Sequence, residues 1–507
     1  MTTVLCTIAV YLIGMVIVGF VLSKKNETAD DFYLGGRKLG PLVTAMSAEA
    51  SDMSGWLLMG LPGIALVYGI AEASWTAIGL AIGTYINWLV VAKRLRERSQ
   101  KIGAITVPEY FSKSFGDDKN VLSLVAALII IVFFIPYTAS GFNACGTLFS
   151  SLSGGKISYT AAMLVSAAVI VAYTILGGFL AASTTDLIQS IVMTVALIVV
   201  VFFGINYAGG WSEVVANAES MPSFLSLVGH YNPETGGSVP FGAMSIASTL
   251  AWGLGYFGMP HILLRFMAIE NPGKLKTSRR IATVWVVISM AVAVLIGVIG
   301  SAIVKSGVIG AEIADPSKSQ RIIVEIAKVI STHNVLCAII AGVILAGILA
   351  ATMSTADSQL LAASSSASED ILKRFFKLKV STKTSMIIAR CTILAISVIS
   401  VIWAWKENSV FSIVSFAWAG FGASFGPVVL ASLFWKRANK YGILAGMLGG
   451  GSMVFIWKYG IAKLGGIFAI YELLPAFLFG CLLIVAVSLA TGKSTASEGE
   501  NAEVAAD

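Results

Sequence analysis

The sequence predicts an all-α integral membrane protein that crosses the bilayer about thirteen times. Three observations predict this class. The 507 residues are 57% hydrophobic and only 12% charged, whereas a soluble domain carries about 25% charged residues. Apolar stretches of about 20 residues, each long enough to cross about 30 Å of hydrocarbon, recur along the chain. Two of these stretches are interrupted by glycine, proline and acidic residues, which indicates spans with broken helices.

The first apolar stretch, residues 4–22, predicts a retained membrane helix. No basic region precedes it, no A-x-A-like cleavage site accompanies it, and it is longer than the apolar part of a usual secretion signal. Lys24 and Lys25 follow it directly, as they would follow a first span that stays in the membrane.

The remaining spans divide the chain into four parts. Residues 1–40 hold the first helix and its loop, residues 41–434 form a core of ten spans, and residues 435–490 add two C-terminal spans. The tail, residues 491–507, is polar and acidic without periodicity, which predicts disorder. We expect the thirteen spans near residues 3–22, 41–67, 71–92, 119–142, 158–178, 186–206, 239–264, 281–304, 334–365, 385–405, 409–434, 440–460 and 467–490.

The basic residues predict the orientation of these spans. If the N-terminus lies outside, 26 of the 34 Lys and Arg residues fall on or beside cytoplasmic segments. Residues 93–101 carry five of them and the outer segment 207–238 carries none. Since short cytoplasmic loops are enriched in Lys and Arg, we expect the N-terminus outside and the C-terminus inside. The net charge of +7 therefore reports membrane topology, and we expect no nucleic-acid partner.

Cysteine and histidine usage excludes several other classes of site. The five cysteines are scattered without a C-x-x-C pair, and the three histidines lie far apart in sequence. These spacings predict neither a disulfide framework nor a zinc site. The sequence also lacks a recognisable nucleophile–base pair or nucleotide-binding loop, so we expect no enzyme.

Two interrupted spans predict where a ligand binds. The second span holds Glu49 and Asp52 in SAEASDMSGWLLMGLPG, and the seventh holds four glycine or proline residues in AWGLGYFGMPHILLRF. Each opens a group of five spans, 2–6 and 7–11, and because five is odd the second group must be inverted relative to the first. Paired broken helices in inverted halves are a sequence pointer to a transporter's binding site. The alternative is a pair of kinks eased by small residues for helix packing.

Intramembrane polar residues predict an ion site near the first break. The acidic candidates are Glu49, Asp52, Asp186 and Asp357, because a carboxylate at mid-bilayer is costly unless it faces protein, water or an ion. In the ninth span, one helical face combines the carbonyl of Ala351 with the hydroxyls of Ser354, Thr355 and Ser358. Hard cations prefer such oxygen ligands, although the same face could serve only for close packing. Trp56, Trp252 and Tyr256 lie within the broken segments, where rings could close over a small ligand.

Several of these stretches resemble the sodium/solute symporter family, most closely its sodium/proline symporter branch. GGFLA and the MST stretch are typical of the whole family, whereas SDMSGW and WGLGYFGMPHILLRFMA point to the proline branch. The similarity runs from the first cytoplasmic loop to the eleventh span. The stretches that carry it are DDFYLGGRKLGP (30–41), SDMSGWLLMGLPG (51–63), VPEYF (107–111), ILGGFLA (175–181), WGLGYFGMPHILLRFMA (252–268), MSTADSQLL (353–361) and AWAGFGASFGPVVL (417–430).

The resemblance implies a fold and a set of site residues. The fold would be LeuT-like, with five plus five inverted spans, one helix before them and two after. Sodium would bind the backbone oxygens of Ala50, Met53 and Ala351 and the hydroxyls of Ser354 and Thr355, with Asp52 supporting the unwound segment. Some relatives bind a second sodium ion, for which Asp186, Asp357 and Ser358 stand in suitable places. The substrate pocket would be formed by Ser54, Gly55, Trp56, Tyr137, Trp252, Tyr256 and Pro260.

The implied function is sodium-coupled uptake of L-proline across a bacterial plasma membrane by alternating access, with no obligate protein partner. Two positions depart from the family pattern: Glu49 stands where relatives often have a small residue, and Met259 where they often have a polar one. Coupling to protons, or transport of another small carboxylate or amino acid, therefore remains open. A channel or a transporter-like sensor is a more distant alternative, since the chain shows neither a filter sequence nor an appended signalling domain.

Overall fold

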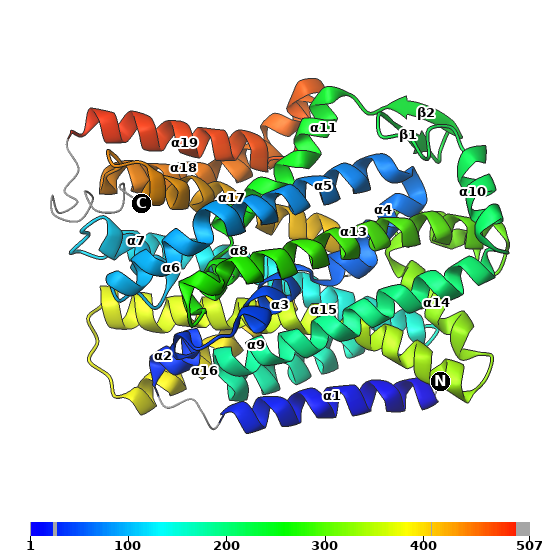
Figure 1. The fold of residues 1–507 in the computed structure, drawn as a ribbon, viewed down its shortest axis with the longest axis horizontal. Helices are drawn as coiled ribbons and strands as arrows, with labels where there is room; N and C mark the ends of the chain where they lie inside the picture. The colour runs from blue at the N-terminus through cyan, green and yellow to red at the C-terminus, as the bar shows by residue number, and fades with distance from the viewer. Residues whose placement is uncertain (1, 24–27, 407, 493–507) are drawn as a thin grey trace.

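A computed structural model describes residues 2–23, 28–406 and 408–492, and the helical class is confirmed (Figure 1). Lys24, Lys25 and residues 493–507 of the predicted tail lie outside the described residues. Long helices lie side by side along the molecule, and α1 begins at the end opposite to the one where α19 finishes (Figure 1). A two-stranded antiparallel hairpin of β1 (Gly229–Asn232) and β2 (Gly237–Pro240) lies at one end of the bundle.

The helices follow the predicted spans with shorter helices between them. The long helices are α1 (Thr2–Ser23), α5 (Ile70–Ile86), α8 (Val121–Leu152), α9 (Tyr159–Tyr207), α13 (Leu275–Lys305), α15 (Val335–Ser365), α16 (Thr382–Trp403), α17 (Val410–Phe434), α18 (Lys440–Tyr459) and α19 (Leu473–Ala490). The shorter ones are α2 (Ala29–Leu34), α3 (Pro41–Asp52), α4 (Leu61–Tyr68), α6 (Ala92–Lys101), α7 (Val107–Ser114), α10 (Trp211–Ser220), α11 (Ala243–Leu250), α12 (Pro260–Ala268) and α14 (Ile322–Ser331).

Nine helices among the described residues are long and apolar enough to cross a membrane, or ten if the bent pair of residues 41–52 and 56–68 counts as one span. The thirteen predicted spans exceed this number for identifiable reasons. The fifth and sixth predicted spans fall within the single helix α9 of 49 residues. The seventh is divided between α11, a 3-10 helix and α12, so that no continuous helix spans it. The twelfth corresponds to α18, which is not among the helices counted.

Helix α9 is not one straight rod. Gly178 within it has φ 68° and ψ −175°, a conformation that L side chains rarely adopt, so two helical segments meet at this residue. The ninth predicted span, residues 334–365, agrees with α15, from which a wider helical segment, residues 366–375, continues. The end of α15 falls in the polar run SSSASED at residues 364–370, whereas no proline or polar run marks the break at Gly178.

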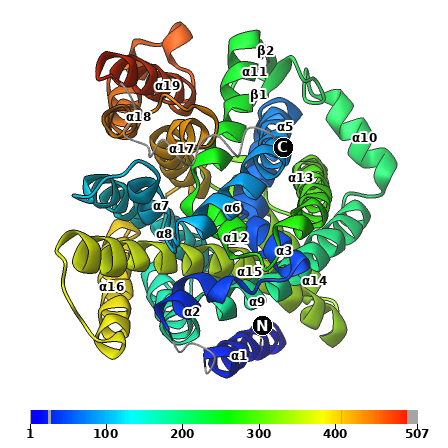
Figure 2. The same cartoon turned by 60° about the vertical axis from the view of Figure 1, so that its left-hand side comes forward.

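The broken helices lie at the centre of the bundle. Viewed with one side turned forward, α3 and α12 lie inside a surround of other helices, with α1 and the α18–α19 pair on the periphery (Figure 2). Glycines allow α5 to lie very close to residues 251–258, the break in the seventh predicted span. A Cβ added to Gly83 on α5 would lie 2.3 Å from the carbonyl oxygen of Gly253. The backbones of α5 and the seventh-span break therefore touch without intervening side chains.

Candidate functional site

The first break follows Asp52, and the prediction of an interrupted second span is confirmed. Helix α3 ends at Asp52, and Met53 leaves the helical conformation with φ −80° and ψ 72°. The chain resumes as a helical turn at Trp56, bent by 59° from α3. Glu49 and Asp52 lie in the last turn of α3 and are 1% and 0% exposed. Both carboxylates are therefore enclosed by protein at the break.

The second break separates α11 from α12, as predicted for the seventh span. Residues Ala251–Gly258 form a 3-10 helix, η4, and Met259 is extended with φ −76° and ψ 109°. Helix α12 then begins at Pro260, where the missing proline N–H costs nothing because the first N–H groups of a helix have no intrahelical partner. Gly255 is required here, since a Cβ would lie 1.9 Å from Nε1 of Trp418.

Asp52 connects the two breaks. Its Oδ2 accepts a hydrogen bond from the hydroxyl of Tyr256 at 2.5 Å. Its backbone carbonyl accepts from Nε1 of Trp56 at 3.1 Å and from the hydroxyl of Tyr137 at 3.4 Å. Three residues predicted for the substrate pocket thus surround one residue predicted to support the ion site. The second carboxylate oxygen, Oδ1, is buried without a hydrogen-bond partner among the described residues.

Aromatic rings cover the same region from the side of η4. The Trp252 ring lies 6.3 Å from that of Trp56 and 5.0 Å from those of Phe411 and Tyr471. Tyr471, which precedes α19, is fixed by two hydrogen bonds: its N–H donates to Ser248 Oγ and its hydroxyl donates to the Ser415 carbonyl. The predicted pocket residues are all buried, so the pocket is closed in this conformation.

Hydrogen bonds bring together four of the five residues predicted to bind sodium, namely Ala50, Ala351, Ser354 and Thr355. Ser354 Oγ donates to the carbonyls of Ala50 at 2.8 Å and Ala351 at 3.2 Å, and Thr355 Oγ1 donates to Ala351 at 3.1 Å. Carbonyl and hydroxyl groups thus meet where the end of α3 contacts α15, a set of oxygen ligands that suits a hard monovalent cation. Met53 follows at the C-cap of α3 and is fully buried, and its N–H donates to the Glu49 carbonyl within α3 at 2.9 Å.

The predicted pocket residues around the first break are close to α8 and α15. Ser54 Oγ accepts a hydrogen bond from the N–H of Trp56 at 3.5 Å. A Cβ added to Gly55 would lie 3.0 Å from the Ala144 side chain on α8 and 3.5 Å from Thr352 Oγ1 on α15. Backbone at this turn can thus approach both helices, which places its amide and carbonyl groups at the interface between them.

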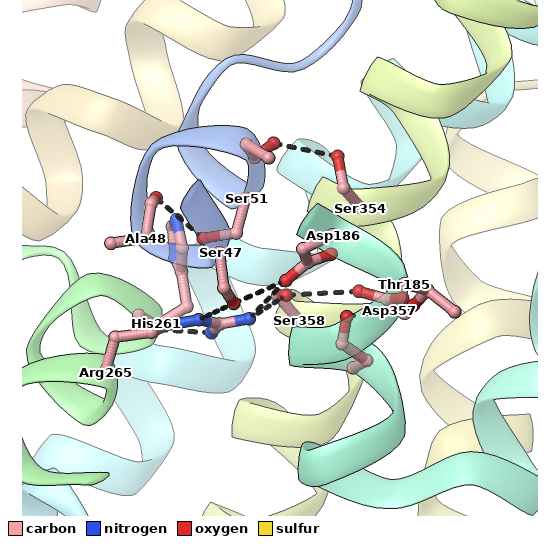
Figure 3. Close-up of polar contacts among 12 residues, drawn as sticks. Ser47, Ala48, Ser51, Thr185, Asp186, His261, Arg265, Ser354, Asp357 and Ser358 are labelled. Carbon is pink, nitrogen blue, oxygen red and sulfur yellow. Dashed lines mark hydrogen bonds and ion pairs between the residues drawn. The ribbon is translucent and has the colours of Figure 1, made fainter. Parts of the chain in front are cut away.

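A second polar cluster joins four helices (Figure 3). Arg265 on α12 donates from Nη2 to Asp186 Oδ2 on α9 at 3.1 Å and to Ser358 Oγ on α15 at 2.5 Å. Its Nε donates to Ser47 Oγ on α3 at 3.0 Å, and Ser47 in turn donates to Asp186 at 2.6 Å. Arg265 and Asp186 are 1% and 0% exposed, so this is a fully buried ion pair.

Asp357 belongs to the same cluster through Ser358. Its Oδ1 accepts from Ser358 Oγ at 3.1 Å and its Oδ2 from the Tyr173 hydroxyl at 2.9 Å. A small cavity of about 10 Å³, lined by Asp357, Tyr173 and residues around the α9 break, lies beside it and has room for about one water molecule. The cluster thus contains two carboxylates and one guanidinium, and only Asp186 contacts the guanidinium directly.

Hydrogen bonds hold the start of α3 next to the end of α12. Leu39, just before α3, pairs with Ile269, just after α12, in a parallel β-bridge. Arg37 donates to the Met267 carbonyl at 2.6 Å and Arg96 donates to the Ile269 carbonyl at 2.7 Å. These donors satisfy carbonyls that the end of α12 leaves without intrahelical partners. Burial and the nearby Arg96 lower the pKa of Arg37 to about 10. Because this value is still well above neutral pH, the guanidinium remains charged.

Sequence reasoning missed two buried residues of α12, Arg265 and His261. Arg265 was not among the intramembrane charges, although a single basic residue within HILLRFMA carries the same signal as the acidic ones. His261 was considered only as a potential zinc ligand. Its ring lies against Phe134 and Tyr137 on α8, at centroid distances of 5.7 and 6.4 Å.

Comparisons with known proteins give a consistent family. The model of the sodium:solute symporter family matches residues 32–450. The chain is 42% identical to the sodium/proline symporter of Salmonella typhimurium, covering 98% of this chain and 95% of that protein. It is 43% identical to the high-affinity proline transporter PutP of Bacillus subtilis, covering 94% and 96%. A solved Na⁺-coupled sialic acid symporter has a similar fold, with a TM-score of 0.78 at 18% identity over 97% of this chain and 99% of that one.

Proposed function

The chain belongs to the sodium:solute symporter family, and we propose that it takes up L-proline together with sodium ions by alternating access. The observation that carries the proposal is the position of Asp52, whose Tyr256 contact joins the two breaks while the neighbouring Ala50 contacts the oxygens of α15. Substrate and ion would therefore share one short segment of backbone. Relatives named as proline carriers support the choice of substrate.

The proposed topology has thirteen spans in a multi-pass protein of the plasma membrane. It counts α9 as two spans that meet near Gly178, and it counts α11 with α12, and α18, as spans although they fall outside the apolar helices found by length and composition. Spans 2–6 and 7–11 form the inverted repeat. The start of α1 and the end of α19 lie at opposite ends of the bundle (Figure 1), which supports an odd number of spans, and the Lys and Arg distribution assigns the N-terminus to the outside and the C-terminus to the inside.

Sodium in this proposal binds between the end of α3 and α15. Its ligands are the carbonyls of Ala50, Met53 and Ala351 and the hydroxyls of Ser354 and Thr355. In the structure the Ser354 hydroxyl donates to the Ala50 carbonyl and the Thr355 hydroxyl to the Ala351 carbonyl. An ion entering there replaces these hydroxyl–carbonyl bonds with ion contacts. Asp52 supports the segment through Tyr256 and adds negative charge near the cation.

The substrate in this proposal lies between the two breaks. Its carboxylate meets free backbone N–H groups and half-helix N-termini, whose dipoles favour negative charge. Its apolar ring packs against the rings at the breaks. The pocket residues are Ser54, Gly55, Trp56, Tyr137, Trp252, Tyr256 and Pro260.

The proposal assigns one sodium ion to each transport cycle. Arg265 already donates to Asp186 and Ser358, two of the three residues implied for a second sodium ion, and its positive charge opposes a further cation. Sodium titration of uptake tests this assignment. A Hill slope of one that stays one in Asp357→Ala supports it, whereas a slope of two that falls to one in this variant would establish the second ion.

Coupling follows from differential affinity for two states. Filling both sites favours closure outside and opening inside, where separation of the Leu39–Ile269 contact would release substrate and ion. One sodium ion that crosses 100 mV supplies about 2.3 kcal/mol. At about 1.4 kcal/mol per tenfold ratio, the potential alone sustains a gradient of about 40-fold.

Uptake by the purified protein in liposomes tests the function. Radiolabelled L-proline is supplied under an inward sodium gradient, an inward proton gradient or no gradient, with Asp52→Ala as the control variant. Saturable uptake that requires sodium and is lost in the variant is expected. Uptake driven by protons alone would assign coupling to another carboxylate, and absence of uptake under every gradient would refute L-proline as the substrate.

A further inference from the structure

His261 is the second residue of α12 and is completely buried, with 0% exposure. Neither Nδ1 nor Nε2 of its ring has a hydrogen-bond partner among the described residues. An imidazole always carries at least one N–H, and its other nitrogen accepts or donates according to protonation. A buried ring with both nitrogens unpaired is costly and rare, so the ring is expected to pair with a group that the protein itself does not supply.

The two aromatic side chains that pack against the ring do not hydrogen-bond to it. Phe134 offers only an aromatic face, and the Tyr137 hydroxyl is directed to the Asp52 carbonyl. Arg265, one turn further along α12, is a donor whose Nη1 bonds to the His261 carbonyl. Its positive charge thus lies one helical turn from the ring and disfavours a cationic partner. An acceptor with negative charge is the partner that fits.

The position of the ring agrees with such a partner. Pro260, a proposed pocket residue, directly precedes His261, and Tyr137, another, packs against the ring. Through Tyr137 the ring is one contact away from the carbonyl of Asp52 at the first break. Helix α12 also begins here, so its first N–H groups and the positive end of its dipole favour an anion at this point.

We propose that His261 binds the carboxylate of the transported substrate by donating a ring N–H to it, above the first turn of α12. The inference rests on the proposed function, because it requires a substrate with a carboxylate. It identifies which half-helix receives that group. His261 thereby becomes a substrate-contacting residue that sets the preference for amino acids over their neutral derivatives.

His261→Phe and His261→Gln test the proposal as a pair. Phenylalanine keeps a ring against Phe134 and Tyr137 but removes both nitrogens, whereas glutamine keeps a hydrogen-bond donor. We expect His261→Phe to raise KM for L-proline by about 10- to 100-fold, the effect of losing a hydrogen bond to a charged group. We expect His261→Gln to stay within about threefold of the wild type, and maximal uptake per transporter to change little in either variant.

Inhibition by L-prolinamide, which lacks the carboxylate, distinguishes contact from a structural role. If His261 binds the carboxylate, its replacement by phenylalanine leaves the inhibition constant of L-prolinamide unchanged while that of L-proline rises. An equal rise for both compounds, or an unchanged KM for L-proline, would overturn the inference. Wild-type protein without sodium-dependent L-proline uptake would instead refute the proposed function itself.

Thermal stabilisation by ligand provides a measurement that is independent of transport. A ligand that binds the folded state raises its melting temperature, so L-proline is added to purified protein at fixed sodium concentration. If His261→Phe does not fold, His261→Leu, which also lacks both ring nitrogens, takes its place. Stabilisation of this variant by L-proline as large as that of the wild type would overturn the inference.

Discussion

Arg265→Met is predicted to destabilise the protein strongly. The guanidinium is 1% exposed and donates to Ser47, Asp186, Ser358 and the His261 carbonyl. Methionine fills a similar apolar volume but leaves Asp186 and Asp357 as two buried carboxylates without a cation. Removing one partner of a buried ion pair costs about 3–5 kcal/mol, a large part of the stability of a typical folded protein.

Removing a carboxylate from the cluster is predicted to destabilise the protein less than removing its guanidinium, because the cluster contains two carboxylates and one guanidinium. Asp186→Asn leaves Arg265 balanced by Asp357, to which it connects through Ser358. The amide oxygen of asparagine can still accept from Ser47 and Arg265, so the expected cost is about 1 kcal/mol. The double variant Arg265→Met/Asp186→Asn should recover part of the loss, since only one buried carboxylate remains unpaired.

Thermal unfolding of purified variants in detergent measures these differences. Arg390→Met is the matched control, because Arg390 on α16 is exposed and an exposed substitution usually changes stability by less than about 0.5 kcal/mol. We expect the melting temperature to fall in the order wild type, Asp186→Asn, the double variant and Arg265→Met, with wild type the highest. An Arg265→Met protein that melts with the wild type, or an Asp186→Asn protein that loses as much as Arg265→Met, would refute the charge argument.

Three further predictions concern the two breaks and their closure. Tyr256→Phe removes the hydroxyl that bonds to Asp52, and the sodium concentration for half-maximal uptake should rise about 10- to 100-fold; an unchanged sodium titration would contradict a role in the ion site. Tyr471→Ala removes the stack on Trp252, worth about 0.5–1.5 kcal/mol, so KM for L-proline should rise about 2- to 10-fold, which competition uptake measures. Arg37→Gln weakens the closure at the end of α12, and efflux of preloaded L-proline without a sodium gradient should become faster than in wild type; equal efflux would argue against the closure.

Local chemistry explains why the two breaks could be predicted from the sequence. Gly253, Gly255 and Pro260 weaken a helix wherever they occur, and Asp52 within an apolar stretch needs a polar environment in any fold of this length. The apolar stretches likewise identify most spans, because a lipid-facing backbone must be helical. These features depend only on residues that are close together in the chain, so a single sequence is enough to recognise them.

Contacts between distant segments could not be predicted in the same way. Asp186 and Arg265 are 79 residues apart, and nothing local pairs them; Arg265 was therefore overlooked while Asp186 was assigned to an ion. The same holds for His261, whose importance arises only because its surroundings on α8 lack a partner. The predicted end of the ninth span at residue 365 agrees with α15, whereas the wider helical segment that continues to Phe375 was not predicted.

The glycine contact between α5 and η4 has a consequence for how quickly the protein can change state. Helices that interlock through long side chains must pass through strained rotamers to shift, which adds a barrier to every movement. Gly83 and Gly253 present bare backbone to one another, so at this contact η4 and α5 can shift without a side chain changing its rotamer. Larger residues at either position would be expected to raise the barrier to this movement and to slow the transport cycle, even in a protein that still binds its ligands.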